Sequence, residues 1–125
     1  MRLALVVIAL FLWTGSAHAQ RTVVNGKTSQ LYFFASINPD CSARGYPTVN
    51  ITQQPQHGRV KIARGQDFVT FPESNVRSAC NRRRVGGVGL HYTAQRGYTG
   101  PDSIGAEVVY SSGRYRRGTF NIYVR

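Results

Sequence analysis

Short β-rich segments separated by turn-forming residues run through most of the 125-residue chain. Glycine and proline recur between these segments, and no long stretch repeats its apolar residues with the period of a helix. In segments 48–53 and 59–64, apolar and polar residues alternate, as in strands with one buried face. The β-rich segments are 22–24, 31–37, 48–53, 59–64, 67–71, 88–93, 103–111 and 115–124. The pattern predicts an all-β fold, an antiparallel β-sandwich of about seven strands.

The middle of the chain departs from this regular spacing. Residues 65–66 predict a turn and residues 67–71 a returning strand, in which we expect Phe68 to be buried. Residues 72–87 are polar, contain one of the two cysteines and include four arginines. We expect residues 72–87 to form a long loop.

The first nineteen residues have the composition of an export signal. Arg2 follows the initiator methionine, an uncharged apolar run covers 3–13, and residues 17–19 form the cleavage site A-H-A. The apolar run is too short for a membrane-spanning helix, which needs about 20 apolar residues. We therefore interpret residues 1–19 as a cleavable signal peptide, with an uncleaved N-terminal anchor as the alternative. Cleavage would leave residues 20–125 as one periplasmic or secreted domain with no further transmembrane segment.

Export gives the two cysteines a simple interpretation. An even pair of cysteines in a small domain outside the cytoplasm predicts one disulfide, between Cys41 and Cys80. The alternatives have less support, because the pair has no neighbouring histidines for a zinc site and does not form the C-x-x-C motif of redox proteins.

The chain is strongly basic. Sixteen basic residues against five acidic ones give a formal net charge of +11, and loss of Arg2 with the signal peptide would leave +10. Almost all of these bases are arginines, which suit bidentate contact with carboxylates and phosphates. Because export argues against nucleic acid, the expected partners are an anionic envelope polymer, lipopolysaccharide or an acidic glycan, or another envelope protein. The alternative is that the charge serves only solubility.

Three stretches in the second half carry a more specific signal. They are P-Q-H-G-R-V at 55–60, L-H-Y-T at 90–93 and G-Y-T-G-P-D-S at 97–103. In this order they resemble the bacterial immunoglobulin-like, cadherin-like domains of secreted and surface proteins, and the resemblance extends over 48–124. It implies a single immunoglobulin-like sandwich.

The residues of these motifs also have folding roles that follow from their chemistry. Gly58, Gly97 and Gly100 can adopt backbone angles that are closed to other residues. Tyr98 can lay its ring across one end of the sandwich, and Asp102 can accept hydrogen bonds from neighbouring backbone N–H groups. We therefore expect the motif to be structural.

Patterns for catalysis and metal binding are weak. His57 and His91 are the two histidines after residue 19, and no G-x-S-x-G nucleophile motif accompanies them. The five acidic residues are scattered, so the calcium sites of some cadherin-like domains are not expected here. We expect no enzymatic activity, no metal and no cofactor.

Two arginine clusters, one in the predicted loop and one at the last hairpin, are the strongest functional candidates. The anion-binding candidates are Arg82, Arg83, Arg84, Arg114, Arg116 and Arg117, and the aromatic contacts beside the second cluster are Tyr110 and Tyr115. Arginine and tyrosine together can bind phosphates or acidic sugars. The alternative is a solvated face whose charges keep strand edges from aggregating.

These observations predict a noncatalytic exported binding or structural module that contacts an anionic partner through its arginines. A lectin-like or protein-binding module, in which aromatic rings dominate, is the alternative. An enzyme or an enzyme inhibitor is the third hypothesis.

Overall fold

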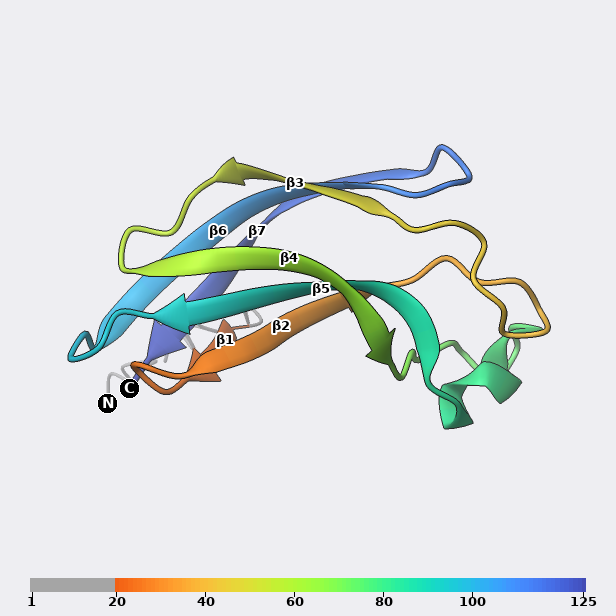
Figure 1. The fold of residues 1–125 in the computed structure, drawn as a ribbon, viewed down its shortest axis with the longest axis horizontal. Helices are drawn as coiled ribbons and strands as arrows, with labels where there is room; N and C mark the ends of the chain where they lie inside the picture. The colour runs from red at the N-terminus through yellow and green to blue at the C-terminus, as the bar shows by residue number, and fades with distance from the viewer. Residues whose placement is uncertain (1–19) are drawn as a thin grey trace, which may run out of the picture.

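Seven strands form two facing sheets in residues 20–125, the part of the chain that the computed structural model describes (Figure 1). The strands are β1 (Gln20–Val23), β2 (Thr28–Phe34), β3 (Thr48–Gln53), β4 (Gly58–Asp67), β5 (Val85–Ala94), β6 (Gly100–Val109) and β7 (Tyr115–Val124). The predicted signal peptide, residues 1–19, lies outside the described residues. The prediction of an all-β sandwich is confirmed.

The two sheets contain three and four strands. One sheet has the order β2-β5-β4 and the other β1-β7-β6-β3, so the chain changes sheet at every connection except those from β4 to β5 and from β6 to β7. Four of the five strand pairs are antiparallel, as expected, and β1 pairs with β7 in parallel. The parallel register joins only Gln20–Val23 to Asn121–Val124.

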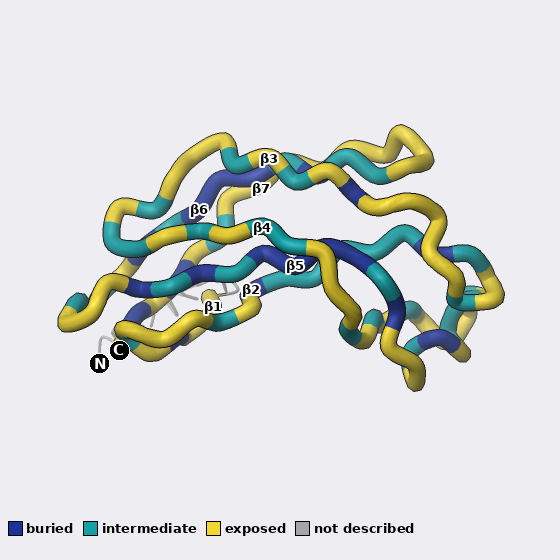
Figure 2. Tube along the Cα trace, viewed as in Figure 1, coloured by how far each residue is buried: buried dark blue, intermediate teal, exposed yellow. Residues whose placement is uncertain are grey.

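The core lies between the two sheets and follows the period-two alternation of the strands. Leu90 and Tyr92 of β5 face Ile104 of β6 and Ile122 of β7, and all four side chains are fully buried. Figure 2 shows the buried positions concentrated along β5 and β6, each of which lies between two other strands of its sheet. Burial of one such side chain contributes about 1.5–3 kcal/mol.

The predicted turn at 65–66 and the returning strand at 67–71 are wrong. β4 continues through Gly65 and Gln66 to Asp67, because β5 begins at Val85 and its first residues pair with them. Phe68 is 53% exposed rather than buried. Glycine favours a turn locally, but the hydrogen bonds between β4 and β5 extend the strand through Gly65.

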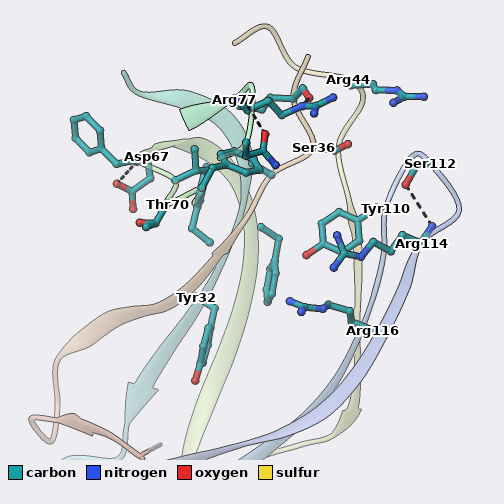
Figure 3. Close-up of a pocket in the computed structure, with 18 of the residues that line it drawn as sticks. Tyr32, Ser36, Arg44, Asp67, Thr70, Arg77, Tyr110, Ser112, Arg114 and Arg116 are labelled. Atoms are coloured by element: carbon teal, nitrogen blue, oxygen red, sulfur yellow. Dashed lines mark hydrogen bonds between the residues drawn. The ribbon is translucent and has the colours of Figure 1, made fainter. Parts of the chain in front are cut away.

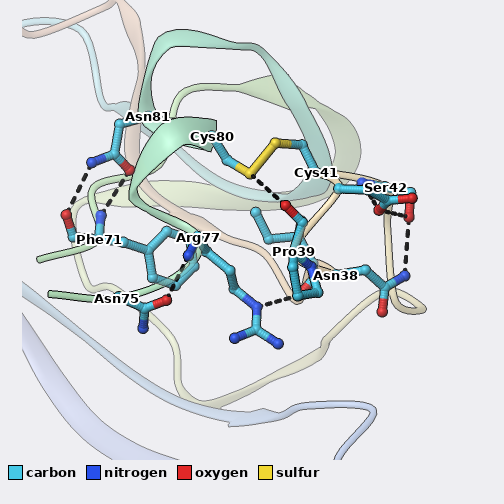
Figure 4. Close-up of a disulfide and its surroundings, with 11 residues drawn as sticks. Asn38, Pro39, Cys41, Ser42, Phe71, Asn75, Arg77, Cys80 and Asn81 are labelled. Carbon is cyan, nitrogen blue, oxygen red and sulfur yellow. Dashed lines mark hydrogen bonds between the residues drawn. A yellow bond between two sulfur atoms is a disulfide. The ribbon is translucent and has the colours of Figure 1, made fainter. Parts of the chain in front are cut away.

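The disulfide joins the loop before β3 to the segment before β5 (Figure 4). Cys41 and Cys80 are bonded, with their Cα atoms 5.5 Å apart, as predicted. The expected long loop at 72–87 contains the 3-10 helix η1 (Ser78–Arg82), and no helix in residues 20–125 has the length and apolarity of a membrane span. Cys80 is fully buried beside Ile37 and Val85 in a second, smaller core. The bond thus holds the loops at one end of the sandwich together.

Candidate binding groove

A groove of about 970 Å³ follows the free edge of β2 (Figure 3). One wall is formed by β7 and the hairpin before it, and the other by residues 67–72 after β4. Within residues 20–125, no strand closes the gap between the two sheets here. β2 is an edge strand, and β1 covers only the last four residues of β7.

The groove is strongly basic. The arginines that line it are Arg21, Arg44, Arg77, Arg114 and Arg116. Among its lining residues Asp67 is the one acid. The carboxylate of Asp67 already accepts hydrogen bonds, from Gln30 Nε2 at 2.6 Å and from the backbone N–H of Phe68 at 2.7 Å. Five guanidinium groups beside one occupied carboxylate make the groove a site of positive potential, which attracts anions.

The pairing of β6 with β7 explains why Arg116 points into this groove. Arg116 lies opposite Val108, which is buried in the core, and residues opposite each other in an antiparallel pair share a face. Arg117 lies opposite Glu107 and so faces outward. Figure 3 shows Arg114 and Arg116 extending from the hairpin into the groove.

The hairpin cluster predicted from the sequence is therefore divided between two faces. Arg114, Arg116 and Tyr110 line the groove, whereas Arg117 and Tyr115 do not. The Tyr115 hydroxyl donates to Glu107 Oε2 at 2.9 Å, and this hydrogen bond raises the pKa of Tyr115. The alternation of Phe120, Ile122 and Val124 in the sequence was a signal for this division, since it places even-numbered residues of β7 on the inner face.

The loop cluster of Arg82, Arg83 and Arg84 lies apart from the groove and contributes no lining residue to it. Arg84 donates through Nη2 to the backbone oxygen of Gln66 at 3.0 Å. All three side chains are exposed. The structure does not bring the two predicted clusters together in this groove.

Three groove arginines were missed by the sequence analysis because they are isolated in the sequence. Arg21 comes from β1. Arg44 is held by its backbone, which donates to Ser36 O at 2.7 Å and accepts a hydrogen bond from the Ser111 hydroxyl. Arg77 donates through Nε to Ile37 O at 2.8 Å. Only the folded chain brings these residues beside Arg114 and Arg116.

Aromatic rings hold two of the guanidinium groups in place. The Arg21 guanidinium lies 5.1 Å from the centroid of the Tyr32 ring, and that of Arg114 lies 5.9 Å from the Tyr110 ring. Such cation–π contacts orient an arginine without neutralising its charge. These arginines therefore keep their charge for a ligand.

The sequence motif around Asp102 builds structure at the other end of the sandwich, as expected. The Asp102 carboxylate accepts hydrogen bonds from the Tyr92 hydroxyl at 2.7 Å and from the backbone N–H groups of Gln56, His57 and Ser103 at 3.0, 3.0 and 2.8 Å. Burial alone would raise its pKa, but these four donors together hold the pKa of Asp102 below its usual range.

Tyr98 and the motif glycines complete this end. The Tyr98 ring stacks on the imidazole of His57 at 3.9 Å between centroids, and its hydroxyl donates to Pro101 O at 2.6 Å. Gly97 and Gly100 have positive φ angles of 86° and 135°, as expected, but Gly58 does not. Glycine is needed at position 58 for space, because a Cβ there would lie 2.4 Å from Cε2 of Tyr92. Within residues 20–125, no three His, Cys, Asp or Glu side chains gather as a metal site.

Comparisons with protein-family models, with curated proteins and with solved structures found no match for this chain. The interpretation of the groove therefore depends on its own geometry and charge.

Proposed function

We propose that this chain is a noncatalytic, exported immunoglobulin-like module that binds an anionic partner in the groove between β2 and β7. The observation that carries the proposal is that five arginines, against a single carboxylate that already accepts hydrogen bonds, line a groove of about 970 Å³. Arginines from four separate parts of the chain line this one groove, so the fold concentrates positive charge there. Charged hydrogen bonds from guanidinium groups recognise carboxylates, sulfates and phosphates alike.

Two further features support an exported domain of this type. The Cys41–Cys80 disulfide is typical of proteins outside the cytoplasm. The two-sheet sandwich is compatible with the fold that the cadherin-like resemblance implies, and the Asp102 network has the folding role expected from its chemistry. A periplasmic or secreted location makes lipopolysaccharide, acidic glycans and acidic segments of envelope proteins the available anions.

Salt dependence and a pair of double variants test the proposal. We expect the exported protein to bind heparin oligosaccharides, lipopolysaccharide or poly-L-glutamate, and to lose affinity as ionic strength rises from about 0.05 to 0.5 M. Arg114→Gln/Arg116→Gln should weaken binding by about tenfold or more, because two charged hydrogen-bond donors leave the groove. Dissociation constants from isothermal titration calorimetry at each salt concentration provide the measurement.

The matched control is Arg82→Gln/Arg83→Gln, which removes the same charge outside the groove. It should weaken binding by less than about threefold at moderate salt, since only long-range attraction is lost. Binding that persists unchanged at high salt, or equal losses in the two double variants, would contradict the proposal. Comparison of heparin, lipopolysaccharide and poly-L-glutamate shows whether the groove prefers a sulfated glycan, a lipid-linked phosphate or a carboxylate-bearing polypeptide.

A further inference from the structure

The first half of β7 has an open backbone edge beside the groove. β1 pairs only with Asn121–Val124, so within residues 20–125 no strand lies beside residues 115–120 of β7 on the side away from β6. Tyr110 donates its N–H to Arg114 O at 2.8 Å, so the backbone groups of Arg114 face β6. Alternate residues of a strand direct their N–H and C=O groups to opposite edges, and Arg116 and Gly118 therefore also face β6. The N–H and C=O groups of Tyr115, Arg117 and Thr119 therefore face the open edge. Arg125 is also an odd-numbered residue, and its N–H donates to Val23 O at 3.0 Å on the β1 side, away from β6.

Space for a ligand lies along this edge. Gly118 is on the inner face, opposite Ala106 of the core, yet a Cβ added to it would meet no atom within 4 Å. An inner-face position in a sandwich is normally filled by packing between the sheets. Here the position next to Arg116 is open, so a side chain from outside can enter between Arg116 and Phe120.

The charges on this edge exclude some partners and favour others. An unpaired strand edge is a template for another strand, and charges on the edge decide which strand can approach. A second copy of this chain would bring its own Arg114, Arg116 and Arg117 against the same residues, and like charges oppose that pairing. An acidic strand would meet Arg114 and Arg116 on its inner face and Arg117 on its outer face.

We propose that the free edge of β7 takes an extended acidic polypeptide segment as an added strand, which pairs with Tyr115, Arg117 and Thr119 and lies in the groove. The proposal rests on the proposed function and narrows its partner class to protein. A polysaccharide can contact the arginines, but it has no backbone amides with the strand spacing that this edge presents. The added strand continues the line of β1 along β7 and directs alternate carboxylates at Arg114 and Arg116.

Peptides that differ only in backbone methylation test this pairing on the exported protein. The probe is a capped peptide of about six residues, alternating Glu and Val, a length typical of one strand. Two controls carry N-methyl groups, one on every Glu and the other on every Val. All three peptides have the same charge. In a strand, alternate N–H groups point to opposite edges, so the N–H groups of the Glu residues lie on one edge of the peptide and those of the Val residues on the other. Only one of these edges can face β7.

One of the two methylated peptides should bind about tenfold or more weaker than the parent, and the other should bind within about threefold of it, because only one set loses its bonds to β7. Hydrogen exchange should show new protection of the Tyr115, Arg117 and Thr119 amides in the complex with the parent peptide. Equal affinity of the three peptides, or protection that falls on β2 instead, would overturn the added strand.

This result separates the two proposals. Heparin oligosaccharide binding that depends on Arg114 and Arg116, together with equal affinity of the three peptides, would leave an anionic site but reject the strand. Absence of binding by the peptides and by every anionic probe would reject both proposals.

Discussion

Asp102→Ala should lower the free energy of unfolding by about 4 kcal/mol, the largest effect that we expect from a single substitution in this domain. The carboxylate is 9% exposed and accepts hydrogen bonds from four donors, one of them the hydroxyl of the fully buried Tyr92. Alanine would leave the Tyr92 hydroxyl and the N–H groups of Gln56 and His57 without this acceptor. Urea unfolding followed by far-ultraviolet circular dichroism gives the free energy of unfolding.

Two variants serve as controls for this result. Asp102→Asn keeps one acceptor oxygen and should lose less stability than Asp102→Ala. Glu107 lies on the outer face of the sheet, where its carboxylate accepts hydrogen bonds from Asn50 and Tyr115. Glu107→Gln should change the free energy of unfolding by less than about 0.5 kcal/mol. Similar losses in Asp102→Ala and Glu107→Gln would show that the buried network is not what holds this end of the sandwich.

The same carboxylate gives stability a defined pH dependence. The pKa of Asp102 is held below its usual range in the folded protein, whereas an unfolded aspartate has a pKa of about 3.9. Its contribution is therefore complete above about pH 5 and is lost as the pH falls through the folded-state pKa. Hydrogen bonds from Ser42 also lower the pKa of Asp40. Asp40 is unchanged in Asp102→Asn, so its contribution to the pH dependence is the same in both proteins. The difference between the acid unfolding curves of wild type and Asp102→Asn isolates Asp102.

Loss of the disulfide is the second large effect. Cys41→Ser/Cys80→Ser should lower the free energy of unfolding by about 3–4 kcal/mol, because the bond joins residues with a sequence separation of 39 and restricts the unfolded chain. The single variant Cys41→Ser should in addition leave Cys80 as a thiol in the small core beside Ile37 and Val85. Urea unfolding with and without reductant measures the effect.

The double variant is also the control for the reductant, since its unfolding midpoint should not respond to reduction. In the non-reduced wild type, thiol titration should detect no free thiol. Two reactive thiols in the non-reduced native protein would contradict the disulfide, and an unchanged midpoint on reduction would contradict its stabilising role.

The local chemistry of the sequence predicted much of the fold. Alternation located β3 and most of β4, the cysteine pair predicted the disulfide, and the position of Asp102 in a turn motif predicted its bonds to backbone N–H groups. Each of these features depends on residue chemistry or on short-range pattern. The error at 65–71 had a long-range cause, because Gly65 and Gln66 pair with Gly87 and Gly86 of β5, which lie far along the chain.

The groove was only partly predictable for the same reason. The hairpin arginines form a cluster in the sequence, and alternation along β7 places Arg116 and Arg117 on opposite faces. Arg21, Arg44 and Arg77 come from separate parts of the chain, and no local pattern relates them to the hairpin. Within the part of the chain that the structure describes, β1 pairs with Asn121–Val124 alone, and the opening lies beside residues 115–120 of β7.

The most direct test of the binding groove compares Arg116→Gln with Arg117→Gln. The two residues are adjacent, and each substitution removes one positive charge, but Arg116 lines the groove and Arg117 lies on the other face of the sheet. The measurement is the dissociation constant for a heparin oligosaccharide at one moderate salt concentration. We predict that Arg116→Gln weakens binding by about fivefold or more and Arg117→Gln by less than about twofold. Equal losses in the two variants, or a larger loss in Arg117→Gln, would contradict the groove as the binding site.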